Sequence, residues 1–319
     1  MTLIGYHASH EQFAPSHLVR LVQAAEQSGF LAAKSSDHIH PWSERQGQSG
    51  FAWSWLGAAM QVTQFGFGCI SAPGYRYHPA ILAQAAATIG EMFPDRFWLA
   101  LGTGEALNES ITGEAWPDKP ERNARLAECV AIFRALFAGE TVTHRGRVTV
   151  VEAKLYSRPA KPVPLFGAAV TPATAAFCAT WADGLLTLGG DVETVRKVIA
   201  AFRENGGAGK PIHVQHSLSW APEENKALEL ALDQWAPVSA GGDVNWDLRR
   251  PRDFDTVGKI VGEEQIRQSV AVSADLGRHA KWLNDLAEAG ADAIHLHCVG
   301  RNQEAFIEAF GKSVVGQVA

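Results

Sequence analysis

Residues 97–108 read Phe-Trp-Leu-Ala-Leu-Gly-Thr-Gly-Glu-Ala-Leu-Asn, in which five apolar residues are followed at once by small, polar and acidic ones. Residues 30–42 repeat this arrangement, because Phe-Leu-Ala-Ala leads into Lys-Ser-Ser-Asp-His-Ile-His-Pro-Trp. Each stretch is typical of a buried strand that ends in a polar loop. In a barrel of alternating strands and helices, the carboxyl ends of the strands form the mouth where chemistry takes place. We therefore expect the two polar clusters to meet at such a mouth.

The rest of the chain alternates in the same way between short apolar runs and longer amphipathic segments. Strands are predicted at 3–8, 31–36, 65–70, 97–102, 164–169, 184–188, 213–220 and 293–298. Helices are predicted at 15–28, 79–92, 120–138, 172–181, 192–205, 222–235, 278–289 and 302–312. Proline is favoured at the start of a helix, and it marks several of these starts, at Pro15, Pro79, Pro120, Pro172 and Pro222. The eight alternations predict an α/β fold, a single (β/α)8 TIM barrel over residues 1–319.

Two stretches interrupt the alternation. Residues 43–54 are rich in Gly, Gln and Ser, and residues 237–263 are rich in Gly, Asp, Arg and Trp. We interpret both as loop insertions at the barrel mouth. A doubly wound sheet with two domains is the rival architecture, but no Gly-x-Gly-x-x-Gly motif opens the first helix after the first strand. The barrel is therefore preferred.

The composition is that of a soluble globular protein. Hydrophobic residues make up 46% of the 319 residues and charged residues 19%, with a net charge of −6. An acidic balance gives no reason to expect binding to nucleic acid or to an anionic membrane. The four cysteines form no CxxC motif, and no signal peptide or membrane span is evident. We expect a cytoplasmic protein that acts on a small molecule.

The first polar cluster offers a candidate base. His38 follows the predicted strand at 31–36, and histidine has the ordinary pKa best suited to moving a proton near neutral pH. Asp37 could orient a neighbouring group or cap the loop. Trp42 could stack on a flat ring or shield a reacting centre from water, although core packing is the simpler role in a chain with 10 tryptophans.

The second cluster offers a candidate acid. The segment from Gly102 to Gly104 presents backbone N–H groups without side chains, and Glu105 could supply a proton if burial raised its pKa. Asn108 can both donate and accept hydrogen bonds. The alternative is that the glycines only turn the chain, and that Glu105 begins the next helix favourably to its dipole.

A metal-dependent barrel hydrolase is a second hypothesis. His38 with His40, and His295 with His297, each place two imidazoles on one side of an extended chain, as barrel metal sites require. Pro41 favours a turn at the first pair, and no further set of ligands is evident at other strand ends. We therefore expect no metal, and we keep a non-catalytic flavin carrier as a third hypothesis.

Three motifs resemble those of the luciferase-like flavin and deazaflavin oxidoreductases. They are Ser36-Asp37-His38 with Pro41-Trp42, Arg76-Tyr77-His78-Pro79-Ala80, and the run of residues 102–109, Gly-Thr-Gly-Glu-Ala-Leu-Asn-Glu. Residues 11–15, Glu-Gln-Phe-Ala-Pro, extend the resemblance to the start of the chain. It is closest to the branch typified by coenzyme F420-dependent glucose-6-phosphate dehydrogenase.

The resemblance implies a homodimeric barrel that binds the ring of F420 in its mouth. His38 would take the proton of a substrate hydroxyl, Glu105 would protonate the ring nitrogen, and Trp42 would lie beside the reacting centre. The peptide between Ile70 and Ser71 would be cis. The implied cofactor contacts are Asp37, Ile70, Ser71, Thr103, Gly104, Asn108, Val170, Thr171, Gly189 and Gly190. The implied substrate contacts are Glu11, Trp42 and Lys259.

Departures from the sequence of this branch limit the range of expected substrates. Residues 168–172 read Ala-Ala-Val-Thr-Pro where the resemblance implies paired glycines around the cofactor phosphate, and Asp191 replaces a phosphate-binding lysine. A carboxylate repels a phosphate dianion, so glucose 6-phosphate is not the expected substrate. We expect an oxidoreductase that moves hydride between F420 or FMN and a small neutral alcohol, sugar or carbonyl compound. An FMN-dependent monooxygenase or reductase is the alternative within the family.

Overall fold

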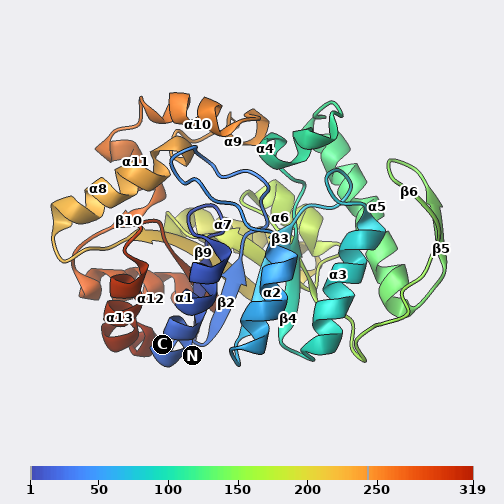
Figure 1. Cartoon of the computed structure of the whole chain (residues 1–319), viewed down its shortest axis with the longest axis horizontal. Coiled ribbons are helices and arrows are strands. Elements are labelled where there is room, and N and C mark those ends of the chain that lie inside the picture. Colours follow the sequence, from blue (N-terminus) through green and yellow to red (C-terminus); the bar gives the residue numbers. More distant parts are fainter. Residues whose placement is uncertain (1, 243, 319) are drawn as a thin grey trace.

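The barrel is closed by hydrogen bonds between the first and last of its strands. The computed structural model describes residues 2–242 and 244–318, and in this part of the chain eight parallel strands form the barrel with helices around it (Figure 1). The barrel strands are β1 (Leu3–Ala8), β2 (Ala32–Ser35), β3 (Gly66–Ser71), β4 (Phe97–Leu101), β7 (Leu165–Ala168), β8 (Gly184–Leu188), β9 (Ile212–Ser219) and β11 (Ala293–Cys298). β1 pairs with both β2 and β11, and β9 pairs with both β8 and β11. The predicted TIM barrel is confirmed, and each predicted strand overlaps an observed one.

Helices surround the barrel. They are α1 (Pro15–Gln27), α2 (Ala52–Gln61), α3 (Pro79–Met92), α4 (Ala106–Glu109), α5 (Lys119–Ala138), α6 (Pro172–Ala179), α7 (Val192–Phe202), α8 (Glu224–Trp235), α9 (Val244–Asp247), α10 (Pro251–Gly258), α11 (Glu263–Ser269), α12 (Leu276–Glu288) and α13 (Gln303–Ser313). The two short helices α4 and α9 lie at the mouth of the barrel, where their residues line the cavity described below. Proline starts α1, α3 and α6, as predicted. Pro222 does not, because Glu223 is the N-cap of α8.

The two predicted insertions differ from expectation. The first, predicted at 43–54, overlaps the start of α2 at Ala52, and α2 connects β2 to β3. The second is not a loop, because it contains the short helices α9 and α10. Proline stands at the first position of α10, and Phe254 anchors this helix to the rest of the protein as a fully buried residue. A hairpin of β5 (Val142–Arg145) and β6 (Thr149–Ala153), outside the barrel, was also not predicted.

An aromatic cluster fills the lower half of the barrel. The Trp98 ring of β4 lies 4.7 Å from Phe166, 4.6 Å from His213 and 5.6 Å from His295, measured between ring centroids. Gly68 on β3 makes room for it, because a Cβ atom at Gly68 would lie 2.0 Å from the Trp98 ring. These residues come from the early parts of their strands. A ligand can therefore enter the barrel interior only from the carboxyl ends of the strands.

The expected cis peptide between Ile70 and Ser71 is not found, because the described residues contain no cis peptide bond. Both residues belong to β3 and pair in regular register with Ala100 and Leu101 of β4. A trans peptide satisfies that ladder without the ~3–4 kcal/mol that a cis bond would cost.

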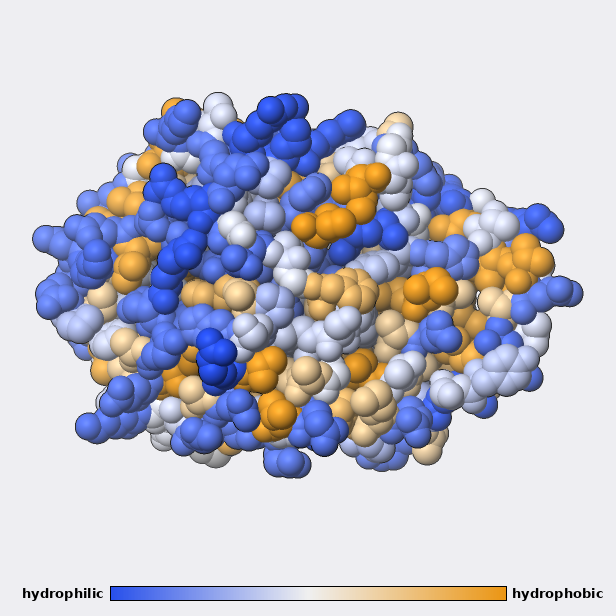
Figure 2. All heavy atoms as spheres, in the orientation of Figure 1, coloured by the Kyte–Doolittle hydropathy of each residue, from blue (hydrophilic) through white to orange (hydrophobic). Residues whose placement is uncertain are grey.

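The outer surface is mixed in character. On the face in Figure 2, hydrophobic atoms are interrupted by hydrophilic ones. In residues 2–242 and 244–318, no helix combines the length and the apolar character needed to cross a membrane.

Candidate active site

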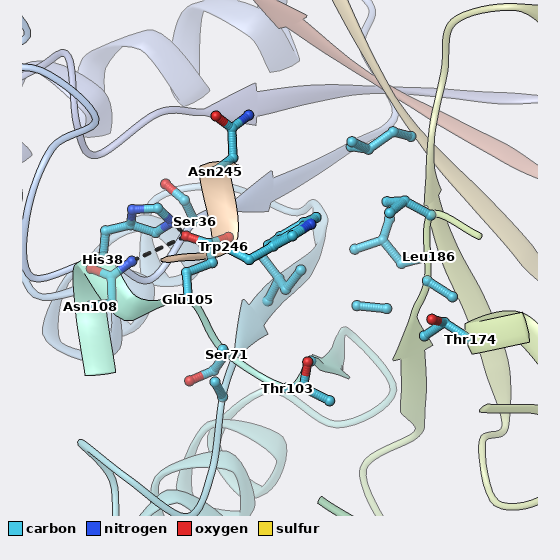
Figure 3. Close-up of a pocket in the computed structure, with 18 of the residues that line it drawn as sticks. Ser36, His38, Ser71, Thr103, Glu105, Asn108, Thr174, Leu186, Asn245 and Trp246 are labelled. Atoms are coloured by element: carbon cyan, nitrogen blue, oxygen red, sulfur yellow. Dashed lines mark hydrogen bonds and ion pairs between the residues drawn. The ribbon is translucent and has the colours of Figure 1, made fainter. Parts of the chain in front are cut away.

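A cavity of about 1120 Å³ opens at the carboxyl ends of the strands. The polar clusters that follow β2 and β4 both line this cavity, as expected from the sequence. Figure 3 shows His38, Glu105 and Asn108 close together, with Leu186 and Thr174 across the pocket. The predicted site residues on its wall are Glu11, Asp37, His38, Trp42, Ile70, Ser71, Thr103, Gly104, Glu105, Asn108, Val170, Thr171 and Gly189.

His38 lies between two carboxylates. Its Nδ1 atom is 3.5 Å from Glu11 Oε1, and its Nε2 atom is 3.9 Å from Glu105 Oε2. Nδ1 is also 3.3 Å from the carbonyl oxygen of His40. A carbonyl can only accept a hydrogen bond, so the geometry favours the tautomer with the proton on Nδ1. The Nε2 lone pair of neutral His38 then faces the cavity and can take a proton.

Glu11 is held as an anion by the donors around it. Burial raises its pKa, but His38 and hydrogen bonds outweigh this effect, so that the pKa lies below its ordinary value. The hydroxyls of Ser9 and Ser36 donate to Glu11 Oε2 at 2.8 and 2.9 Å. A carboxylate on the Nδ1 side of a histidine stabilises the imidazolium that forms when Nε2 accepts a proton.

Glu105 has the opposite electrostatic environment. Burial raises its pKa above the ordinary value, although the His38 imidazole opposes the rise. Gly104, immediately before it, has a φ angle of 77°, and a Cβ there would lie 2.7 Å from Glu109 Cγ. Only glycine fits this turn without strain. The turn therefore places a carboxyl group that readily keeps its proton beside His38.

Asn108 fastens the His38 loop to α4. Its Oδ1 atom accepts hydrogen bonds from the backbone N–H groups of Ile39 at 2.9 Å and His40 at 3.3 Å. Its Nδ2 group is 3.5 Å from Glu105 Oε2. Asn108 thus connects the loop that carries the candidate base to the helix that follows the candidate acid.

Asp37 is surrounded by donors from three elements. Its Oδ2 atom accepts from Ser71 Oγ at 2.6 Å and Trp53 Nε1 at 3.2 Å, and its Oδ1 atom accepts from Tyr77 at 3.0 Å. Arg76 Nη1 is 3.4 Å from Oδ1. These bonds fix the loop beneath His38. A role for Asp37 in binding the cofactor stays a prediction.

Trp42 lies against His38, with 5.0 Å between ring centroids. Phe254 of α10 supports Trp42 from behind at 5.3 Å. The helix α10, which was not predicted from the sequence, therefore positions Trp42, which was.

Comparison with known proteins agrees with this geometry. The family model described as luciferase-like monooxygenase matches residues 1–293. The chain belongs to this family. The resemblance stated from the sequence motifs is confirmed.

Several relatives of this luciferase-like protein match over nearly their whole length. An F420-dependent glucose-6-phosphate dehydrogenase of Mycolicibacterium gilvum (strain PYR-GCK) is 34% identical, covering 98% of this chain and 96% of the relative. The enzyme of that name from Mycobacterium tuberculosis (strain ATCC 25618 / H37Rv) is also 34% identical, covering 96% and 95%.

Solved structures give the same result. An F420-dependent secondary alcohol dehydrogenase, in complex with an F420-acetone adduct, superposes with a TM-score of 0.92 at 30% identity, covering 100% of this chain and 99% of that one. A long-chain alkane monooxygenase shares the fold, with a TM-score of 0.76 at 14% identity and coverage of 99% and 90%.

Two predicted contacts of the luciferase-like chain lie outside the cavity. Lys259 follows α10 and borders a separate surface depression with Glu44 and Asp255, because the helix carries it away from the mouth. Gly190 does not line the cavity either. Asp191, expected to repel a substrate phosphate, instead caps α7 by accepting from the Thr194 backbone N–H at 2.9 Å.

The hydrolase hypothesis finds no support in the geometry. Within residues 2–242 and 244–318, no three His, Cys, Asp or Glu side chains gather as a metal-binding group. The rings of His295 and His297 lie against other aromatic side chains, His213 at 5.3 Å and His7 at 4.5 Å.

Many residues of the cavity wall were not predicted from the sequence, and Lys34, Trp246 and His7 are among them. Lys34 carries a signal that could have been used, since a lysine inside the run Ala32-Ala33-Lys34-Ser35 breaks an apolar strand. Trp246 had no such signal, because it belongs to the short helix α9 that was interpreted as loop.

Proposed function

We propose that the protein is an F420- or FMN-dependent oxidoreductase that exchanges hydride with a small, uncharged alcohol, sugar or carbonyl compound. The observation that carries the proposal is the histidine with a carboxylate on each ring nitrogen, on the wall of a cavity large enough for a ring and a substrate. Relatives named as F420-dependent dehydrogenases support the choice of reaction.

The cavity suits a flat ring with one polar edge. Ile70, Val170 and Leu186 supply apolar surface, and His38 with Glu105 supplies polar groups elsewhere on the wall. When bound, the ring supplies the hydride acceptor or donor. Thr103 and Thr171, at the rim, would hold a phosphate-bearing tail, together with Lys119, which already donates to Thr103 Oγ1 at 2.8 Å.

His38 performs the proton transfer on the substrate side. In the direction of oxidation, Nε2 accepts the hydroxyl proton as hydride leaves the carbon, and Glu11 stabilises the resulting positive charge. In the direction of reduction, the same nitrogen returns the proton. Trp42 shields the imidazole from bulk water, which strengthens both electrostatic interactions.

Glu105 serves as the second proton carrier. Its raised pKa keeps a proton available at a pH where an ordinary glutamate would have lost it. Glu105 lies beside His38 Nε2, so it would hold a proton next to a bound ring while His38 acts on the substrate. His38 serves as the base and Glu105 as the acid. The lowered pKa of Glu11 keeps a negative charge beside His38, whereas the raised pKa of Glu105 keeps a proton on that residue.

The charges around His38 support an uncharged substrate. Glu11 and Glu105 flank the imidazole, and Lys259 is not at the cavity. A substrate with an anionic group next to the reacting carbon would approach the Glu11 carboxylate, which is unfavourable in a partly desolvated site.

The test is a pair of titrations of the purified chain, with F420 and with FMN, read by absorbance and fluorescence of the ring. Tight binding of one of them, followed by reduction of the bound ring by an alcohol or sugar, is expected. Tight FMN binding with activity only in the presence of oxygen would indicate a monooxygenase. Binding of neither ring would refute the proposal.

Assembly and location remain expectations. We propose a homodimer in the cytoplasm, as the sequence resemblance implied. Sedimentation velocity of the purified chain checks the first of these, and a monomer would contradict it.

A further inference from the structure

The floor of the cavity carries three polar groups with no partner among the described residues. They are Lys34 Nζ, His7 Nδ1 and His297 Nδ1. All three residues line the cavity, and their exposed fractions are 0%, 4% and 1%. Buried polar groups in native proteins are nearly always hydrogen-bonded, so three such atoms on one cavity wall indicate a ligand that bonds to them.

Strand register brings these groups together. His7 of β1 lies opposite Lys34 of β2, and the rings of His7 and His297 are 4.5 Å apart. Gln215 and Ser217 of β9, both half-buried, continue the polar wall. The aromatic cluster around Trp98 lies below and ends the cavity. The inner end of the cavity is therefore a polar chamber that is closed from below by the aromatic cluster.

The chamber carries little net charge. Burial lowers the pKa of Lys34 to about 8, so its ammonium is mostly protonated at neutral pH. The carboxylate of Glu11 interacts with this ammonium and balances its charge. Burial lowers the pKa of His297 to about 3 and that of His7 well below its ordinary value, so both imidazoles are neutral. Neutral imidazole both donates and accepts hydrogen bonds.

We propose that this chamber, formed by His7, Lys34, Gln215, Ser217 and His297, binds the hydroxyl groups of an uncharged polyol or sugar. The inference rests on the proposed function, and it selects polyhydroxylated substrates over simple alkyl alcohols. An alkyl chain would leave the three buried groups without partners, which a site built for hydrogen bonding strongly disfavours. An anion would meet Glu11, the residue that already balances Lys34. Glu11 also links the chamber to His38, where the oxidised carbon would lie.

The experiment compares xylitol, glucose, 2-propanol and lactate as substrates of the enzyme loaded with whichever ring it binds. For the natural sequence, kcat/KM for the better polyol should exceed that for 2-propanol by at least ~100-fold, because the missing hydroxyls leave buried groups unpaired. Lys34→Met should raise the polyol KM at least ~10-fold and lower the polyol-to-propanol ratio by the same factor. Lys161→Met, which removes an exposed lysine paired with Asp95, is the matched control and should keep the ratio.

Ring affinity and melting temperature show whether Lys34→Met is folded. If it is not, Ser217→Ala and Gln215→Leu report the same ratio from the other side of the chamber. An equal kcat/KM for polyol and 2-propanol would overturn the inference and leave the proposed function intact. A preference for lactate that Lys34→Met abolishes would also overturn it, in favour of an anion site. Absence of ring binding, or of turnover with every substrate, would instead refute the proposed function.

Discussion

His38 touches a carboxylate through each ring nitrogen, so its replacement should separate chemistry from binding. His38→Ala removes the group that takes the hydroxyl proton and leaves the apolar wall of the cavity unchanged. We expect kcat to fall by ~10²–10⁴ while the ring still binds. Steady-state turnover and ring titration measure the two effects. His17→Ala, at a histidine outside the cavity, is the control, and full turnover in His38→Ala would remove this residue from the mechanism.

Glu105 should determine how activity falls at high pH. Its pKa is raised by burial, so the protonated form persists above the ordinary pKa of 4.5 and is lost as pH rises through the raised value. The step that needs its proton should slow over that range. Glu105→Gln cannot transfer a proton, and we expect lower kcat with this alkaline decline removed. A kcat profile against pH is the measurement, and an unaltered decline in the variant would assign it to another group.

At the scale of elements, the loop after β2 and the helix α4 act as one unit because Asn108 joins them. Asn108→Ala leaves two backbone N–H groups, of Ile39 and His40, without their acceptor. We expect a loss of about 1–3 kcal/mol in the free energy of unfolding. We also expect a fall in kcat, since the loop carries His38.

Urea unfolding and steady-state kinetics of the same preparation check this expectation. Asn205→Ala is the matched control, because that exposed amide donates only to the carbonyl of Ala201 in its own helical segment. Stability and kcat as high as those of the natural sequence would show that α4 does not hold the loop.

Elements with local signals were predictable from sequence. The helix α3 begins at Pro79 after a capping His78 and has the predicted bounds, because both signals lie within the segment itself. The helix α2 was missed because its exposed face, formed by Ser54, Ala58 and Gln61, carries no charged residue and so gives a weak amphipathic pattern. Elements that depend on their neighbours give no such local pattern.

The site shows the same division. His38 and Glu105 were predicted because each follows a strand end directly. Their environment was not, because it is assembled from loops after different strands: Glu11 follows β1, His38 follows β2 and Glu105 follows β4. Lys34 was not predicted, because the sequence gives its position in a strand but only closure of the barrel places it on the cavity wall.

At the scale of the whole molecule, buried neutral histidines should make the fold sensitive to acid. Burial lowers the pKa of His10 and His213 to about 4, and that of His216 and His297 to about 3. In the unfolded chain these histidines bind protons once the pH falls below the ordinary pKa of 6.5. In the folded chain they bind protons only when the pH falls to their lowered pKa values. Stability is therefore lost as pH falls from 6.5 toward 4, by about 2 kcal/mol per histidine between pH 7 and pH 5.

His216 offers a direct test of this acid sensitivity. Neither of its ring nitrogens has a partner among the described residues, and it does not line the cavity. His216→Leu should reduce the difference in unfolding free energy between pH 7 and pH 5 by about 2 kcal/mol, measured by urea titration. A pH 7 to pH 5 difference equal to that of the natural sequence would assign the acid loss to other residues.

Pairing of β1 with β11 has a consequence for synthesis of the protein on the ribosome. β1 is synthesised before its partner β11, and the other six strands of the barrel lie between them in the sequence. Until then, the edge of β1 and the side of β9 that receives β11 have unpaired backbone groups, which are prone to join other chains. The polar chamber also lacks His297 during this time. Ribosome-bound chains of this protein should therefore need protection by chaperones until β11 has emerged from the ribosome.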